Sequence, residues 1–203
     1  MNFYISDLHI GHANVIKFDN RPFESTDEMK HVLFDNWNRV VRPEDTVYVL
    51  GDFFWKTVKN WPAMLKELSG HKILVRGNHD PMDLRSHQAA SFNEICDYME
   101  IVDGNRHVIL CHYPIIFHKR DYDPSYWMLY GHVHTTRENT YVETIRKELK
   151  AQYVPNTGRP CGNLINVGCM MPWMNYTPKT LDEIIEGDKM AHAIPTRTFG
   201  TIR

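Results

Sequence analysis

The sequence predicts an α/β protein in which two sheets pack together with helices outside them. Up to residue 76, strand-like apolar runs alternate with helical patterns in the order β-α-β-α-β, which is typical of a parallel sheet covered by helices. From residue 95 onward, a hairpin pattern and further short strands indicate a second, antiparallel half. A chain of 203 residues with 42% hydrophobic side chains is long enough to form one domain with a sizeable core.

Two helices in the first half of the chain carry start and stop signals. Ser25 and Glu28 have the spacing of a capping box at the start of the first helix. In the second helix, Pro62 lies in the first turn and Gly70 follows the last residue. The elements expected in this half are strands at 2–6, 46–50 and 73–76 and helices at 25–40 and 60–69.

The second half of the chain predicts shorter strands and weaker helices. The polar region 135–162 is poor in core residues, and we expect it to be a surface insertion in a single domain that spans 1–203. The other elements expected here are strands at 95–102, 107–111, 127–130 and 164–167, a charged surface helix at 138–150 and a helical turn at 181–186.

Charge and cysteine content limit the classes of partner and the compartment. A net charge of −2 argues against an extended nucleic-acid surface, although bound metal ions could still attract a nucleotide locally. The chain enters a strand directly at its N-terminus, and no apolar stretch approaches the ~18 residues of a membrane span. The four cysteines form no CxxC pair. We therefore expect a cytoplasmic protein with reduced cysteines and no membrane contact.

Polar side chains that bind metals or carry protons follow five of the predicted strands. Strands of one sheet bring their ends within reach of one another, so we expect these side chains to converge. Imidazoles and carboxylates suit Zn, Mn, Fe or Ni, and a spacing of two residues lets one loop supply two ligands. The motifs, in chain order, are Asp7-x-His9, Gly51-Asp52, Gly77-Asn78-His79-Asp80, His112 and Gly131-His132-x-His134.

Each motif also has a simpler interpretation as local structure. Asp7-x-His9 is compatible with a turn that carries a surface histidine, and 77–80 with an Asx-type turn after a strand. His112 is compatible with a core histidine whose hydrogen bonds are satisfied. The joint occurrence of all five motifs at strand ends, and not any one of them, favours a metal site.

The order of these motifs resembles that of the calcineurin-like metallophosphoesterases. The match runs from Asp7 to His134, about two thirds of the chain. The opening Ser-Asp-Leu-His-Ile-Gly-His at 6–12, with Asn-Arg-Pro-Phe at 20–23, is similar to a compact stand-alone branch found in bacteria and their phages. The resemblance implies a four-layer α/β/β/α sandwich of two mixed sheets flanked by helices.

Carried over to this chain, the family pattern implies two metal positions that share Asp52. Asn78 is a neutral oxygen ligand, so the ligand set brings only two formal negative charges and leaves two divalent cations with positive charge to attract a phosphate. The resemblance implies transition-metal ions, with Mn favoured and Fe, Zn or Ni as alternatives. One position takes Asp7, His9, Asp52 and His134, and the other takes Asp52, Asn78, His112 and His132.

The resemblance makes His79 the catalytic residue that faces the substrate and protonates the leaving oxygen. An acid in such a position contributes ~10²–10⁴ in rate. Many family members orient this histidine with an Asp three residues after the bridging Asp, and this chain has Trp55 there. Either another carboxylate, with Asp80 adjacent in sequence, or packing must then position His79.

Two further groups are candidates for contacts with a substrate. His12 and Arg21 closely follow the first ligand pair and could reach a phosphate, although surface solvation also accounts for Arg21. The aromatic runs 122–130 and 170–176 could form a pocket wall, although core packing is the commoner explanation of such runs.

Together, these features predict a binuclear metal-dependent phosphoesterase in which a metal-bridging hydroxide attacks phosphorus. The favoured substrate is a small or cyclic phosphodiester of nucleotide type, because so short a chain shows no cap domain or long groove. The alternatives are a phosphomonoesterase and a non-catalytic scaffold of the same fold, against which the complete set of ligand types argues. A nuclease would need a basic face, which a net charge of −2 does not support.

Overall fold

The first sheet contains four parallel strands in chain order. The computed structural model describes residues 1–80, 89–151 and 162–193. The strands of this sheet are β1 (Asn2–Ile5), β2 (Thr46–Val49), β3 (His71–Val75) and β4 (Glu94–Cys96). Ile5 pairs with Val49, and Val49 pairs with Leu74, so the carboxyl ends of these strands lie at one edge of the sheet.

The second sheet also contains four strands in chain order. Its strands are β5 (Met99–Asp103), β6 (Arg106–Leu110), β7 (Tyr126–Tyr130) and β8 (Leu164–Asn166). The β5–β6 pair is antiparallel, whereas β6–β7 and β7–β8 are parallel. Among the described strands, only the second sheet is therefore mixed, and the expected antiparallel half is reduced to one hairpin.

The strand expected over 95–102 is in fact two strands in different sheets. β4 ends at Cys96 and pairs with β3, whereas β5 begins at Met99 and pairs with β6. Between them, the carboxylate of Asp97 accepts hydrogen bonds from Nε (2.7 Å) and Nη2 (2.6 Å) of Arg76. This ion pair lies at the point where the chain passes from one sheet to the other.

The two sheets join along β1 and the segment that follows β8. Ser6 N donates to Val167 O (2.9 Å), and Cys169 N donates to Ser6 O (2.8 Å). These bonds make a parallel bridge between Ser6 and Gly168. The end of β1, where the first metal-binding motif begins, therefore lies where the sheets meet.

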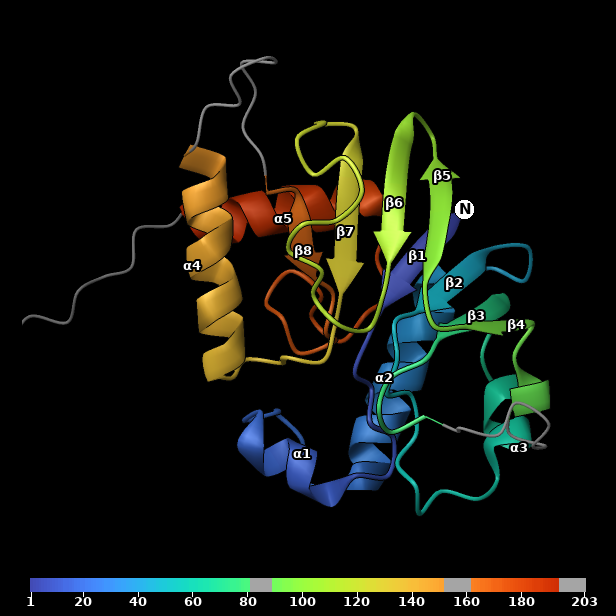
Figure 1. Cartoon of the computed structure of the whole chain (residues 1–203). Helices are drawn as coiled ribbons and strands as arrows, with labels where there is room; N and C mark the ends of the chain where they lie inside the picture. Colours follow the sequence, from blue (N-terminus) through green and yellow to red (C-terminus); the bar gives the residue numbers. More distant parts are fainter. Residues whose placement is uncertain (81–88, 152–161, 194–203) are drawn as a thin grey trace, which may run out of the picture.

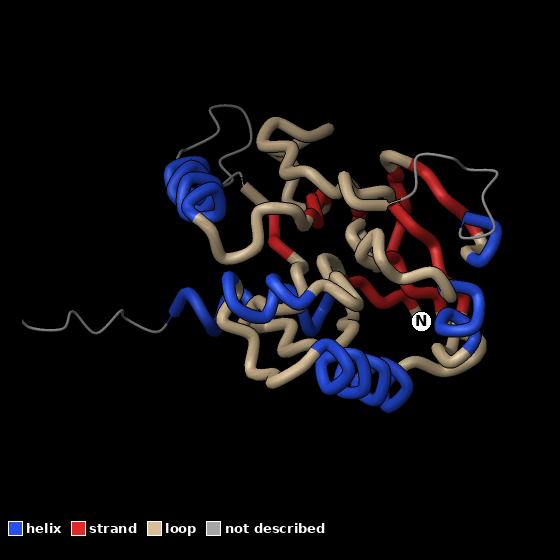
Figure 2. Tube along the Cα trace, turned by 90° about the horizontal axis from the view of Figure 1, so that it is seen from below, coloured by secondary structure: helices blue, strands red, loops and turns tan. Residues whose placement is uncertain are grey.

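Side chains that alternate along the second sheet separate two layers of core. Val108 and Leu129 belong to the larger hydrophobic cluster, which includes the first sheet, whereas Ile109 and Met128 belong to a smaller cluster on the opposite face. Helix α4 (Arg137–Ala151) adds Val142 to the smaller cluster. In Figures 1 and 2 the strands lie in the middle, with α4 beside the second sheet and α2 and α3 beside the first. The layers are those of the α/β/β/α arrangement.

The helices that cover the first sheet begin where the sequence predicts. In α2 (Thr26–Val40), Ser25 is the N-cap and its hydroxyl accepts a hydrogen bond from Glu28 N (3.1 Å). Helix α3 (Trp61–Lys66) carries Pro62 in its first turn but is shorter than expected. Between β3 and β4 the described residues include a short 3₁₀ helix, η1 (Ala89–Ser91).

Three helical features differ from the sequence-based expectation. Helix α1 (Ala13–Phe18) occupies a segment expected to be loop. Helix α5 (Leu181–Ala193) continues well past the predicted turn, because Asp188 in its second half pairs with Arg146 of α4 (2.7 Å between Oδ1 and Nη1). Arg146 and Val142 are buried, so α4 is not solvated all round.

The expected insertion at 135–162 stays a prediction, since 152–161 lie outside the described residues. In the ranges 1–80, 89–151 and 162–193, none of the helices combines the length and the apolar character needed to span a bilayer.

Candidate metal centre

The loops that follow β1, β2 and β3 are bonded to one another at the carboxyl edge of the first sheet. Asp7 N donates to Gly51 O (3.1 Å), and His9 N donates to Asp52 O (2.9 Å). The backbone N of His79 donates to Oδ1 of Asp52 (2.9 Å). The strand ends therefore meet, because the strands are in register and their loops share hydrogen bonds.

Two glycines let backbone and ligand side chains approach closely. A Cβ at Gly77 would lie 2.2 Å from Oδ1 of Asp52. A Cβ at Gly131 would lie 1.9 Å from Oγ of Ser6 and 2.5 Å from Oδ2 of Asp7. Either clash would displace a carboxylate of the site, so both positions require glycine for close approach.

Five of the predicted metal ligands have a left-handed backbone conformation. Residues other than Gly occupy this region sparsely, although Asn, Asp and His enter it more often than others. Such conformations cost on the order of 1–3 kcal/mol each and cluster at functional sites. The φ angles are 56° at Asp7, 51° at His9, 55° at Asp52, 69° at His132 and 47° at His134.

Asp7, His9 and His134 form a buried group of candidate ligands. Their ligand atoms lie within 4.8 Å of one another, and the three residues are at most 6% exposed. Nε2 of His134 lies 3.2 Å from Nε2 of His9 and 3.7 Å from Oδ1 of Asp7. Asp7 also belongs to a second such group, with Asp52 and His112.

Asn78, His112 and His132 surround the other side of Asp52. Nε2 of His112 lies 3.1 Å from Oδ1 of Asn78 and 3.6 Å from Oδ2 of Asp52. Nδ1 of His132 lies 2.9 Å from the same oxygen of Asn78. Oδ2 of Asp52 is also 3.5 Å from Nε2 of His9, so this carboxylate lies between the two groups. Asn78 and His132 are exposed, whereas His112 is buried.

The orientation of the rings fits a bound cation. Nδ1 of His112 faces Leu50 O at 2.8 Å, and since a carbonyl only accepts, this nitrogen carries the proton of the neutral ring. Nε2 of His112 then turns a lone pair toward the oxygens of Asn78 and Asp52, a repulsive arrangement that a cation between them would relieve. Burial, followed by the neighbouring imidazoles, lowers the pKa of His9 and keeps that ring in the neutral form that binds metals.

His79 is exposed at the edge of this cluster and is positioned by packing. Its ring lies against Trp55 (4.7 Å between centroids) and His9 (5.5 Å). Asp80 does not orient it, because the Asp80 carboxylate accepts from the backbone N of Asp52 (2.7 Å), Phe53 (3.1 Å) and Gly77 (2.7 Å). Of the two explanations that the sequence left open, the structure supports packing against Trp55.

His12 lies at the rim of the cluster, as expected of a residue that could meet a substrate. Its ring stacks on Trp55 with centroids 3.6 Å apart and lies 5.6 Å from the ring of His9. Trp55 therefore contacts the rings of both His12 and His79.

Arg21 is not available to a substrate. The residue is only 4% exposed, and all five N–H groups of its guanidinium have partners within the chain. Those partners are the carboxylate of Asp19, the carbonyls of Asp7 and Leu8, and Sδ of Met29. Both the phosphate contact and the surface role considered from the sequence are thus excluded by its burial.

The sequence reasoning missed three residues around the cluster. Asp19 accepts a hydrogen bond from Nδ1 of His134 (2.9 Å to Oδ2). It immediately precedes the Asn-Arg-Pro-Phe motif at 20–23, and that position was the sequence signal by which it could have been found. Phe18 is 53% exposed with its ring 5.6 Å from that of His134, and Tyr113 is 46% exposed with its ring 4.6 Å from that of His132. Phe18 and Tyr113 are single exposed aromatic residues, and the sequence around them has no hydrophobic periodicity that would have pointed to them.

The aromatic runs proposed as a pocket wall belong mainly to the core. Tyr126, Met128 and Tyr130 of β7 are buried in the smaller hydrophobic cluster, and Met171 and Met174 in the larger one. Core packing, the commoner explanation, is the one that the structure supports for these side chains.

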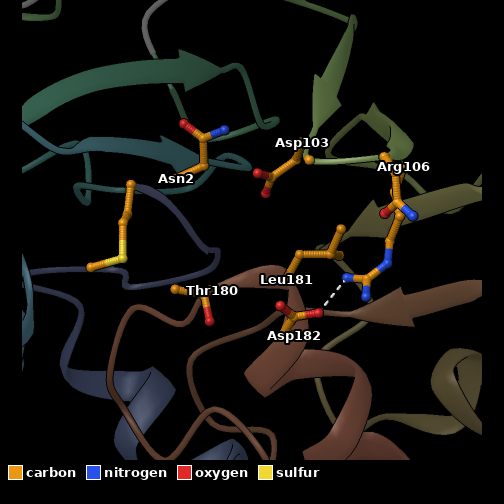
Figure 3. Close-up of a pocket in the computed structure, with 9 residues that line it drawn as sticks. Asn2, Asp103, Arg106, Thr180, Leu181 and Asp182 are labelled. Carbon is orange, nitrogen blue, oxygen red and sulfur yellow. Dashed lines mark ion pairs between the residues drawn. The ribbon is translucent and has the colours of Figure 1, made fainter.

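A separate pocket of about 330 Å³ lies at the opposite end of β1 from the cluster (Figure 3). It is lined by the start of β1, the β5–β6 turn and the start of α5, and the ion pair between Arg106 and Asp182 (2.5 Å) crosses its wall. None of the predicted site residues lines it.

Comparisons with known proteins agree with this geometry. The family model of the calcineurin-like phosphoesterase superfamily domain matches residues 2–180. An uncharacterized protein of Methanocaldococcus jannaschii, MJ1445, is 32% identical over 189 residues, which cover 91% of this chain and 89% of that protein. The Gene 66 protein of Mycobacterium phage L5 is 28% identical over 66% of this chain and 77% of its own length.

A solved structure supports the same fold. The protein of unknown function AQ665 from Aquifex aeolicus superposes with a TM-score of 0.65 at 30% identity, over 92% of this chain and 98% of its own. The family model covers nearly the whole chain, and the carboxylates and imidazoles that it would need for metal ions converge at one sheet edge. The chain therefore belongs to the calcineurin-like phosphoesterase superfamily, a family of metal-dependent phosphoester hydrolases.

Proposed function

We propose that the chain is a binuclear metal-dependent phosphodiesterase that acts on small or cyclic nucleotide-type esters. The observation that carries the proposal is the position of the Asp52 carboxylate, which lies 3.5 Å from Nε2 of His9 and 3.6 Å from Nε2 of His112. A carboxylate between two sets of imidazoles is the geometry by which one side chain can bridge two cations. Exposed His79 stands beside it, bonded to the same carboxylate through its backbone.

The proposed ligands divide into two sets that share Asp52. The cations, two per chain and with Mn favoured over Fe, Zn or Ni, supply Lewis-acid chemistry when bound: they acidify water and withdraw charge from phosphate oxygens. Their ligands carry only two negative charges, so the site keeps a positive field for an anionic ester. The first set is Asp7, His9, Asp52 and His134, and the second is Asp52, Asn78, His112 and His132.

The residues of the chain then act on the leaving group and on the ester substituents. A hydroxide, formed when water releases a proton to solvent, bonds through its oxygen to phosphorus as the ester P–O bond breaks; the ring of His79 gives a proton to the departing oxygen and regains one from solvent. Trp55 holds that ring by packing, and the ring of His12 stacks on Trp55 in turn. We assign His12 a contact with the substrate at this rim.

Exposed aromatic rings support an ester with organic groups on both sides of phosphorus. Phe18 lies beside His134 in the first ligand set, and Tyr113 lies beside His132 in the second. A diester carries two organic substituents and can use both rings, whereas a monoester carries one. Stacking of a base on such a ring contributes roughly 1–3 kcal/mol.

The test is a substrate panel with Mn²⁺ and the metal-free protein as control. We expect kcat/KM for an aryl diester or a 2′,3′- or 3′,5′-cyclic nucleotide to exceed that for an aryl monoester by at least about tenfold, which is ~1.4 kcal/mol in the transition state. Preference for the monoester would make the chain a phosphomonoesterase. No turnover, together with no bound metal by elemental analysis, would favour a scaffold.

The proposal places this activity in the cytoplasm. Among the described residues the three cysteines are free, with Cys111 and Cys169 buried and Cys96 half-buried, which supports a reducing compartment.

A further inference from the structure

His134 is held by a buried carboxylate that is not among the proposed metal ligands. Its Nδ1 donates to Asp19, 3.0 Å from Oδ1 and 2.9 Å from Oδ2. The side chain of Asp19 is completely buried. With the proton fixed on Nδ1, the lone pair of Nε2 points toward Asp7 and His9, where a cation would bind.

Arg21 connects this carboxylate to the backbone of the first ligand loop. Its Nε and Nη2 donate to Oδ2 of Asp19 (3.0 and 2.9 Å). Its Nη2 also donates to Asp7 O (2.8 Å), and its Nη1 donates to Leu8 O (2.9 Å). Arg21 and Asp19 together thus link the loop after β1 to His134 in the loop after β7.

The two loops joined in this way contain unfavourable backbone conformations. Asp7, His9 and His134 have φ angles of 56°, 51° and 47°. Left-handed conformations persist where surrounding contacts fix them, and the Arg21 bonds to two consecutive carbonyls supply such contacts.

The other buried imidazoles of the site lack this support. Nδ1 of His112 donates to a neutral backbone carbonyl, Leu50 O. Nδ1 of His9 is buried with no hydrogen-bond partner among the described residues. A charged acceptor on the distal nitrogen makes an imidazole a stronger ligand, so the arrangement favours the position that contains His134.

We propose that Asp19 and Arg21 are positioning residues that pre-organise the Asp7–His9–His134 metal position and set its affinity. Of the proposed function, the inference requires only that the site binds metal; it does not require that the protein hydrolyses a phosphodiester. The simpler alternative is that the pair merely stabilises the fold, as any buried ion pair would.

The chain contains a matched control for that alternative. Between α4 and α5, Arg146 is paired with Asp188, and Nδ1 of His192 lies 3.2 Å from Oδ1 of Asp188. The Arg146–Asp188 pair is buried like Arg21–Asp19, whereas His192 is exposed and its Nδ1 donates to the backbone O of Asp188 (2.8 Å); within the described residues the set contacts none of the proposed ligands. Asp188→Asn therefore removes the same kind of charge without touching the site.

The experiment measures Mn²⁺ binding to chelator-treated protein by calorimetry and by equilibrium dialysis, with folding checked by circular dichroism. For Asp19→Asn we expect one of the two ions to bind about 10–100-fold more weakly, with the other unchanged. For Asp188→Asn we expect a lower melting temperature and unchanged affinity for both ions. Asp19→Glu, which keeps the charge, should recover part of the lost affinity.

A second measurement follows the His134 ring directly. Long-range ¹H–¹⁵N spectra of histidine-labelled apoprotein should show His134 as a single Nδ1-protonated tautomer in the wild type and as a mixture in Asp19→Asn. If Asp19→Asn fails to fold, the double variant Asp19→Asn/Arg21→Met, which leaves no unpaired buried charge, takes its place with the same expectations.

Three results would overturn the inference. The first is unchanged affinity for both ions in a folded Asp19→Asn or double variant. The second is an equal loss in Asp188→Asn, which would make the effect one of general stability. The third is a wild-type protein that binds no metal, which would remove the proposed function as well; the first two leave that function intact.

Discussion

The two halves of the metal centre differ in burial and in the way they are supported. In the inner half, Asp7, His9 and His134 are at most 6% exposed, and the ion pair behind them, Asp19 with Arg21, has no exposed side-chain surface. In the outer half, defined by Asn78, His112 and His132, the first and last are exposed.

The ion pair nearest the outer half is itself open to solvent. Arg76 lies two residues before Asn78, and the side chains of Arg76 and Asp97 are 18% and 71% exposed. If the proposed function holds, we expect the inner half to retain its cation and the outer half to exchange ions and receive the ester.

The largest effect is expected from Asp52→Asn, because this carboxylate belongs to both halves. Loss of its charge should abolish turnover. The fall in kcat should exceed the ~10²–10⁴-fold fall expected when a general acid is missing. Elemental analysis should find fewer than two ions per chain in the variant. Wild-type metal content with substantial activity would mean that the halves do not share this ligand.

His79→Ala tests the leaving-group role of a residue that borders both halves, since its ring lies against His9 of the inner half and it follows Asn78 of the outer half. With a poor leaving group such as an alkoxide, we expect a fall in kcat of roughly 10²–10⁴, since that oxygen needs a proton. With nitrophenolate, which leaves unaided, the fall should be much smaller. Equal losses for both esters would contradict the assignment of His79 as general acid.

The two halves should differ in the rate at which they release metal to a chelator. On addition of EDTA to the Mn²⁺-loaded protein, we expect two phases of metal release, the faster from the exposed half. Stopped-flow detection with a metal indicator would resolve them. Release of both ions in one phase would show that the difference in burial has no consequence for exchange.

The smallest effect is expected from Asp97→Asn at the exposed ion pair. The hydrogen bond from Arg76 lowers the pKa of Asp97, so the carboxylate stabilises the folded state above its unfolded pKa, and this contribution is lost as pH falls through the folded value. Because the pair is exposed, we expect only about 0.5 kcal/mol at neutral pH. Urea unfolding at pH 7 and pH 2.5 should show a difference from wild type at the first pH alone.

Features set by local sequence were predictable, and those set by distant partners were not. Ser25 and Glu28 identified the start of α2, and the motifs at strand ends identified the residues that converge, because parallel strands in register align their ends. By contrast, the residues that meet at the change of sheet, Asp97 and Arg76, and those that meet between α4 and α5, Arg146 and Asp188, are distant in sequence.

Arg21 shows the same limit within the site. An arginine near a ligand pair suggests a phosphate contact, and only the three-dimensional structure reveals that its hydrogen bonds turn inward. What positions His79 was likewise beyond the sequence, because Trp55 contacts it through packing and not through a hydrogen bond that a motif would record.

The left-handed backbone at five ligand positions has a consequence for evolution and engineering. Glycine at any of them would relieve a conformation that costs an L-residue roughly 1–2 kcal/mol, so selection for thermal stability alone favours replacement of the ligands. Asp and His persist there only while selection for metal binding outweighs that gain. A stabilised variant obtained without an activity screen should therefore accumulate glycine first at an exposed position such as 132 and lose its metal there, whereas the buried bond of His134 to Asp19 opposes glycine at 134.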